Sequence, residues 1–406
     1  MATLPLKMPH PSTLWHEPLS FPILVLGLIV GFCCWAYRWN QRSLPRLAAR
    51  YNVSKHTTNY EGPTIIPLED FEWKTTAPLQ FRPFKGKDRY NLTMALETLD
   101  PSELIPMDST YKERLRLREE LIKQHHDIVV AVNDSPTADP RTRPAVSELY
   151  SFILGNYLPT RYPNMFKVSQ DTKTHCEMFE SVVTGKKWPT TLSTSTPTIR
   201  GLEILAETVD EDFLILLPEA ETEAMGPSDQ PKYILQAYAN CYPAGFNSRE
   251  KLGLRLADIH SPVPGYPEKL ERSMDRFFAR IEVGRFVKRV NWSITTEAEL
   301  FAAFGSIHGP AYAEDGTQQA MKPEDLKLDQ TFLRCERQTL YRLPSSKALV
   351  FGFHTYTYPV QQIKDEGLGE DLAIAIDGLK KGNSPAMYKY KNGNMWGEAL
   401  KAFLRS

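Results

Sequence analysis

The spacing of apolar and polar positions changes along the chain, and each spacing predicts a kind of element. Apolar residues three and four apart predict helices over 98–125, 143–157, 267–282, 366–381 and 396–404. Runs of apolar, β-branched and aromatic residues predict strands over 202–217, 233–241, 288–294 and 348–358. Residues 170–200, rich in Ser, Thr and Lys, predict a loop or short strands. Because the strands cluster between 200 and 360 with helices around them, we expect an α+β fold on a mostly antiparallel sheet.

The N-terminal part has a different pattern, an uncharged apolar run flanked by aromatic residues. Residues 21–39 are predicted to be a transmembrane anchor that follows a tail over 1–20. A cleaved signal peptide is the alternative, but bulky residues stand where its cleavage site would have small ones. Only Lys7 precedes the run and several Arg residues follow it, which predicts a cytosolic domain on a single-pass protein, in the endoplasmic reticulum membrane. A linker over 40–80 would lead into a domain over 81–406.

The composition excludes several classes of protein. The formal net charge of the 406 residues is −1, so no basic excess indicates a nucleic-acid partner. The five cysteines include no CxxC pair, so neither a disulfide framework nor an iron–sulfur site held by this chain alone is expected. No Gly-x-Gly-x-x-Gly or Walker-type loop is present, and a nicotinamide, flavin or nucleotide site of the usual kind is not predicted.

An acidic run, Asp210-Glu211-Asp212, comes directly before the apolar residues of a predicted strand. Three carboxylates could hold a metal ion and a nucleotide-sugar, as in a membrane-anchored glycosyltransferase. The alternative is a solvated turn before a buried strand.

Two long segments carry a family resemblance. They are 241–266, CYPAGFNSREKLGLRLADIHSPVPGY, and 333–359, LRCERQTLYRLPSSKALVFGFHTYTYP. With residues 82–100 and 286–294, they resemble the haem-dependent oxidative N-demethylase family, and the predicted anchor would make the chain a fungal-type, membrane-anchored member. The resemblance implies a PAS-like haem domain that activates dioxygen and oxidises the methyl group of an amine. It also implies haem b as cofactor, and electrons from NADPH through a separate reductase that carries flavin and an iron–sulfur cluster.

The resemblance points to His260 as the iron ligand. Pro262 and Pro264 stiffen the chain directly after it, and such a support would hold an imidazole in one orientation. A structural role remains the alternative, with His260 capping the helix that follows or packing beside the proline turn.

Two neighbouring strands offer further candidates for the site. On a strand, Glu336 and Gln338 share one face and Arg337 and Thr339 the other. As catalytic residues, Glu336 or Gln338 could lie next to an amine substrate or form part of a proton route for oxygen activation. Arg337 could pair with a haem propionate. The same residues could instead face water. The remaining candidates are Arg289 and Arg342 for propionates, and His354 and Tyr356, which either donate to bound oxygen or pack.

Three functions stay open at this point. The first is a haem monooxygenase or oxidative demethylase acting on an amine or another small organic molecule. The second is a haem-based gas or redox sensor, although no output segment follows the domain. The third is the glycosyltransferase.

Overall fold

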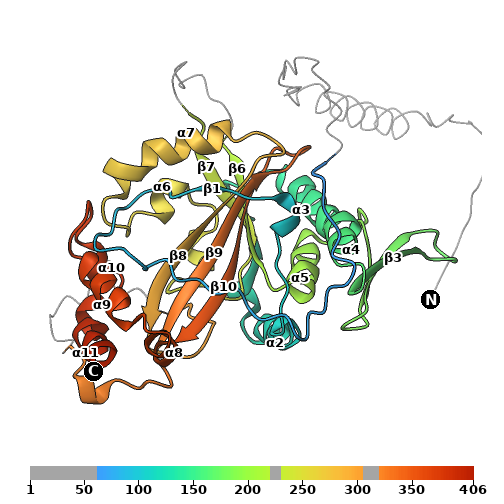
Figure 1. The fold of residues 1–406 in the computed structure, drawn as a ribbon. Helices are drawn as coiled ribbons and strands as arrows, with labels where there is room; N and C mark the ends of the chain where they lie inside the picture. Colours follow the sequence, from blue (N-terminus) through green and yellow to red (C-terminus); the bar gives the residue numbers. More distant parts are fainter. Residues whose placement is uncertain (1–61, 220–229, 305–319) are drawn as a thin grey trace, which may run out of the picture. The chain divides into compact units, whose positions relative to one another are not determined.

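The computed structural model describes residues 62–219, 230–304 and 320–406, and these build a seven-stranded antiparallel sheet with helices on both faces (Figure 1). The order of its strands is β1-β8-β9-β10-β6-β7-β2. Their bounds are β1 Glu97–Thr98, β2 Val130–Val132, β6 Asp212–Pro218, β7 Tyr233–Ala239, β8 Phe286–Thr295, β9 Phe332–Arg342 and β10 Leu349–Pro359. A smaller sheet has the order β3-β4-β5, with bounds Phe166–Gln170, Glu177–Ser181 and Lys187–Pro189.

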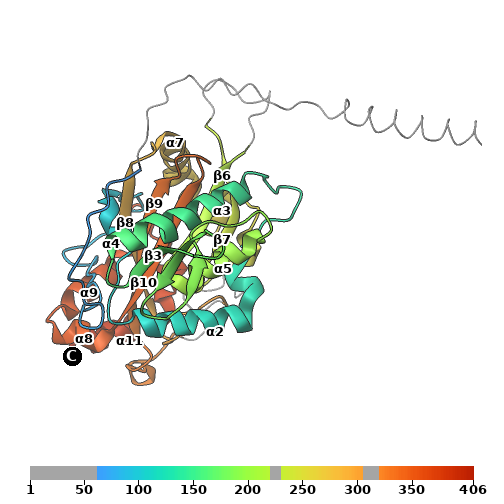
Figure 2. The same ribbon diagram turned by 90° about the vertical axis from the view of Figure 1, so that its right-hand side faces the viewer.

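The helices divide between the two faces of the large sheet. On one side lie α2 Tyr111–Val129, α3 Thr142–Ser151, α4 Leu158–Arg161 and α5 Thr198–Thr208, and these are turned to the viewer in Figure 2. On the other side lie α6 Leu256–Ile259 and α7 Arg272–Arg280, which a π-helical turn, Pro267–Glu271, precedes. The C-terminal part adds α8 Val360–Asp365, α9 Gly369–Gly378, α10 Met387–Tyr390 and α11 Gly393–Arg405. The α+β architecture on an antiparallel sheet is therefore confirmed, while the PAS-like arrangement stays a prediction.

Strand β6, which lies between β10 and β7, shows why both faces of the sheet are covered. Phe213, Ile215 and Leu217 pack into the core formed with α2, α3 and α5. Leu216 belongs to a second core under α6 and α7, and Leu214 faces the same side. A strand buried on both faces reads as a continuous apolar run, which is the pattern that marked this segment in the sequence.

The structure corrects one predicted element. Helix α5 covers residues 198–208, so residues 202–208 of the segment 202–217 predicted as a strand are helical. Gly201, Leu202, Ile204, Leu205 and Ala206 are all buried in it. With apolar residues so dense, the helical and alternating patterns cannot be told apart by period alone.

The predicted membrane anchor needs a larger correction. No helix within the described ranges is long and apolar enough to cross a membrane. The predicted fold with an N-terminal transmembrane helix is therefore corrected to an α+β domain alone for the described ranges. The membrane partner and the endoplasmic-reticulum location were derived from that helix, and they are corrected together with it. The tail over 1–20 and the anchor over 21–39 lie outside the described residues. Of the predicted linker, residues 62–80 include Ile65, which is buried in the main core.

Candidate functional site

A large cavity lies between the sheet and the segment that carries α6 and α7. Its volume is about 980 Å³, at the upper end of the roughly 300–1,000 Å³ that ligand sites occupy. Alternate residues of the strands form its floor: Leu214 and Leu216, Val287 and Arg289, Glu336, Gln338 and Leu340, and Phe351 and Phe353. Cross-strand register aligns Phe351, Leu340 and Val287 into one apolar row. The next row contains Phe353, Gln338 and Arg289, so the floor changes from apolar to polar along the strands.

His260 stands in the wall of this cavity, at the end of α6. Its Nδ1 lies 2.8 Å from the carbonyl oxygen of Leu256, and its ring stacks on Tyr266 with centroids 4.7 Å apart and planes 9° apart. A carbonyl oxygen only accepts, so the proton belongs on Nδ1 and the lone pair on Nε2. Burial lowers the pKa of His260 to about 4, and the positive charges of Arg289 and Lys251 act in the same direction. The imidazole is therefore neutral, as a metal ligand must be.

The proline turn after His260 is fixed at several points. The Val263 amide donates to the carbonyl of His260 at 2.8 Å, and the Ser384 hydroxyl donates to the carbonyl of Pro264 at 2.7 Å. Gly265 takes a φ of +80°, which lets the chain bring Tyr266 under the imidazole. His260 thus caps the end of α6 and stacks on Tyr266 beside the proline turn. Of the two structural alternatives, the cap at the start of the next helix is wrong, and packing beside the proline turn agrees with this position.

The polar end of the floor is a chain of hydrogen bonds across two strands. Arg289 Nε donates to Gln338 Oε1 at 2.7 Å, and Gln338 Nε2 donates to Glu336 Oε2 at 3.0 Å. Burial lowers the pKa of Arg289, although the charges of Tyr90 and Glu336 oppose this. The three side chains that the sequence placed in a site on these two strands therefore meet in one cavity.

The cavity also contains a residue that no sequence pattern marks. Lys391, directly after α10, is only 2% exposed and lines the cavity beside Asn291 and Trp292. Its Nζ donates to the Asn291 Oδ1 at 3.3 Å and to the Trp292 carbonyl. A lysine among polar neighbours near the C-terminus reads as surface, and only the tertiary packing shows that it is buried.

The other predicted site residues lie away from the cavity. Arg337 donates to the carbonyls of Leu104 and Glu103, and Arg342 donates to those of Ile281 and Lys347. Both arginines therefore tie loops and a helix end to the sheet.

His354 pairs across β9 and β10 with Arg337, which puts it on the face opposite Gln338. Its ring stacks on Tyr356 with centroids 4.5 Å apart. The structure does not bring His354 or Tyr356 together with His260.

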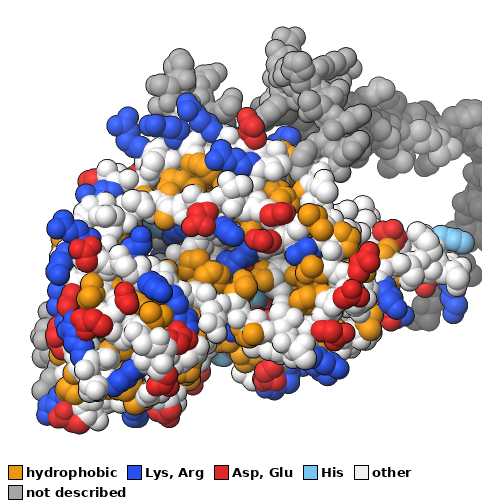
Figure 3. Space-filling model, in the orientation of Figure 1, with side chains coloured by type: hydrophobic (Ala, Val, Ile, Leu, Met, Phe, Trp, Pro, Cys, Tyr) orange, Lys and Arg blue, Asp and Glu red, His pale blue; other side chains and the backbone are white. Residues whose placement is uncertain are grey.

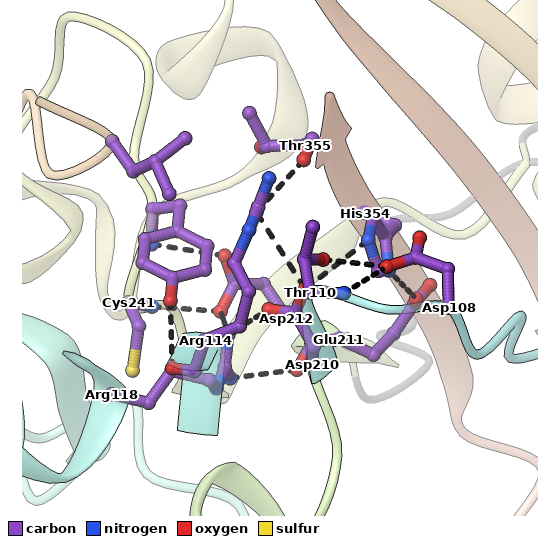
Figure 4. Close-up of polar contacts among 12 residues, drawn as sticks. Asp108, Thr110, Arg114, Arg118, Asp210, Glu211, Asp212, Cys241, His354 and Thr355 are labelled. Carbon is purple, nitrogen blue, oxygen red and sulfur yellow. Dashed lines mark hydrogen bonds and ion pairs between the residues drawn. The ribbon is translucent and has the colours of Figure 1, made fainter. Parts of the chain in front are cut away.

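His354 belongs instead to a buried ionic cluster, which we define as Arg114, Arg118, Asp210, Glu211, Asp212 and His354 (Figure 4). Arg118 Nη1 lies 2.8 Å from Asp212 Oδ1, and His354 Nε2 lies 3.2 Å from Asp210 Oδ2. Burial raises the pKa of Glu211 even though His354 opposes the shift. All three acidic residues are at most 4% exposed, so the solvated turn is wrong, and the carboxylates face cations of this chain. Among the described residues, no group of His, Cys, Asp and Glu is arranged to hold a metal ion.

The cavity, the neutral histidine and the polar end of the floor define a class of protein, an α+β domain with a largely apolar ligand cavity against its sheet. A haem fits these residues, because Nε2 of His260 is free to bind iron, the walls are apolar and Arg289 offers a partner for a propionate. The chain belongs to the family described as haem-dependent oxidative N-demethylase, alpha subunit-like, whose model matches residues 95–401. The family name indicates an oxidative demethylase that depends on haem, and "alpha subunit" implies a further partner.

Proposed function

We propose that this chain is the haem-binding subunit of an oxidative demethylase and that His260 is the axial ligand. The observation that carries the proposal is the orientation of His260, whose Nδ1 is bonded to Leu256 while its ring stands in the cavity wall. The hydrogen bond fixes both the tautomer and the plane of the ring, which is what backbone partners of metal-bound histidines do.

The proposed reaction removes one methyl group from an amine. The amine R₂N–CH₃ combines with O₂, two electrons and two protons to give R₂NH, formaldehyde and water. A C–H bond of the methyl group is oxidised, one oxygen atom enters the formaldehyde and the other leaves as water. Haem, when bound, would supply the iron at which dioxygen is activated. The two electrons come from NADPH through a separate flavin and iron–sulfur reductase, which is the partner that we propose.

The residues of the chain divide the remaining tasks. Arg289 would pair with a haem propionate, and Gln338 holds the Arg289 guanidinium in place. Glu336, at the far end of the same hydrogen-bond chain, is the carboxylate that would face the amine and receive its proton. The apolar row of Val287, Leu340 and Phe351 would exclude water from the cofactor site.

The visible spectrum of the purified full chain tests the ligand. We expect a Soret band that shifts or disappears in His260→Ala, because the only imidazole placed in the described cavity wall is removed. His175→Ala, at an exposed histidine, is the matched control and should leave the spectrum unchanged. In His260→Gly, added imidazole should restore the native spectrum. An unchanged Soret band in His260→Ala would exclude His260 as the ligand. Formaldehyde release in step with NADPH consumption, with a reductase present, then tests turnover.

A further inference from the structure

Lys391 has no role in the proposed reaction, yet burying its ammonium is energetically unfavourable. It is almost fully buried, and among the described residues no carboxylate forms an ion pair with it. Its hydrogen bonds go to two neutral acceptors, Asn291 Oδ1 and the Trp292 carbonyl. An ammonium has three donors, so one remains for a group inside the cavity. A buried cation is tolerated only where an opposite charge or hydrogen bonds compensate for the lost water.

The electrostatic surroundings of Lys391 agree with a buried ammonium that can bind a negatively charged group. Burial lowers its pKa to about 8, Glu336 and Cys335 act in the opposite direction, and Arg289 lowers it further. The rings of Tyr90 and Trp292 face the ammonium at 5.7 and 5.6 Å. Near neutral pH the group is thus mainly charged, and the cavity presents a cation to whatever occupies that end.

Among the charged residues that line the cavity, cationic side chains outnumber acidic ones. Six cationic residues line it, Lys87, Arg89, Lys251, Arg289, Lys389 and Lys391, against two acidic residues, Glu250 and Glu336. Figure 3 shows Lys and Arg side chains spread among acidic and apolar side chains over the face of the molecule turned to the viewer. A cavity with this excess of positive charge favours an occupant that carries negative charge.

We propose that Lys391 binds a carboxylate of the substrate, so that the substrate is an amine that also carries a carboxylate, such as an N-methylated amino acid. This proposal rests on the proposed demethylase function. Glu336 would face the ammonium end of the substrate and Lys391 its carboxylate end. Glu336 and Lys391 both line the cavity and form no ion pair with each other, so each can face one end of a zwitterion.

A haem propionate is also a carboxylate and is the competing occupant. Arg289 lies in the floor of the cavity, where its Nε donates to Gln338. Lys391 is bonded to Asn291 and Trp292, which lie further along the same strand, β8. We therefore assign a propionate to Arg289 and the substrate carboxylate to Lys391.

The test compares two ligands of one shape on the haem-loaded full chain. N-Methylglycine carries the carboxylate and N-methylglycinamide replaces it by a neutral amide, and calorimetry and the shift of the Soret band give both affinities. We expect the acid to bind about tenfold tighter or more, since a hydrogen bond to a charged group contributes roughly 1.5–3 kcal/mol. Lys391→Met should abolish the difference, and Lys381→Met, at an exposed lysine outside the cavity, should keep it.

Four outcomes of this test are informative. Equal affinity of acid and amide for the unaltered chain overturns the proposal. Weaker haem binding in Lys391→Met with an unchanged preference for the acid assigns Lys391 to a propionate, and this also overturns it. If Lys391→Met does not fold, the unaltered chain decides, because the preference must decline as the pH rises through about 8. A chain that binds no haem but still prefers the acid by calorimetry refutes the demethylase function and leaves the carboxylate site standing.

Discussion

Replacing Lys391 by Met should make the fold more stable at neutral pH, although it removes a residue of the proposed site. Burial lowers the pKa of Lys391 from 10.5 to about 8, and at about 1.36 kcal/mol for each pKa unit the buried charge costs about 3 kcal/mol. Two hydrogen bonds, to Asn291 and Trp292, are lost with the ammonium and offset about 2 kcal/mol of that gain. The variant should therefore be about 1 kcal/mol more stable near pH 7.

The sign of this effect should change with pH. The folded-state pKa of this base lies below its unfolded value, so the unfolded state binds the proton more readily. The contribution of Lys391 to the stability of the unaltered chain is then least favourable below pH 8 and recovers as the pH rises from about 8 to about 10.5. Between pH 7 and about pH 9.5 the recovery is about 2 kcal/mol. Relative to the unaltered chain, Lys391→Met should move from about 1 kcal/mol more stable to about 1 kcal/mol less stable.

Urea denaturation of the haem-free full chain at both pH values measures the difference directly. Comparing the two proteins at each pH cancels the titration of every other group that they share. Lys381→Met, at an exposed lysine, should stay within about 0.5 kcal/mol of the unaltered chain at both pH values. A difference between Lys391→Met and the unaltered chain that is the same at both pH values would refute the argument, because the ammonium would then carry no cost of burial.

Three further changes probe the elements around the cavity. Arg118→Met should lower the free energy of unfolding by about 3–5 kcal/mol, since it leaves buried carboxylates without their partner; a loss below about 1 kcal/mol in urea denaturation would contradict this. His354→Gln should lower the melting temperature but leave the Soret band in place, because His354 lies on the opposite face of the sheet; a changed Soret band would restore it as a distal residue. Gly382→Ala would bring a Cβ within 1.7 Å of the Tyr90 carbonyl oxygen, so the loop with Tyr90 would have to move. This displacement should lower the free energy of unfolding by about 1–3 kcal/mol and weaken haem binding in a titration. An unchanged haem affinity would show that the loop is not part of the site.

The sequence could predict the faces of a strand but not the pairing between strands. Alternation alone separates Glu336 and Gln338 from Arg337, and the structure has this arrangement. Where His354 lies depends on its register with Arg337, which is set by how the two strands meet. Local sequence contains no information on that register, so His354 could not be assigned to either face of the sheet.

The burial of charged residues could not be predicted from the sequence for a related reason. Asp210, Glu211 and Asp212 read as a surface turn because charged residues usually are exposed. Asp210 and Asp212 pair with Arg118 on α2, and Glu211 pairs with His354 on β10, both far away in the sequence. The burial of Lys391 likewise depends on residues far away in the sequence, Trp292 on β8 and Tyr90 in a loop. In each case the partner that makes the burial possible is supplied by the tertiary fold.

The ionic cluster also explains how the segment with His260 is held against the sheet. The Asp212 carboxylate accepts hydrogen bonds from the amides of Cys241 and Tyr242, at 2.7 and 3.0 Å. The Tyr242 carbonyl in turn accepts from Arg334, which is itself buried. The segment of chain that leads to α6 therefore begins at a point fixed by buried charges, and it ends at the proline turn, which Ser384 holds. Because Arg118 neutralises Asp212, removing Arg118 should loosen this anchor and weaken haem binding as well as the fold. A haem titration of Arg118→Met, at a temperature where the variant remains folded, separates the two effects.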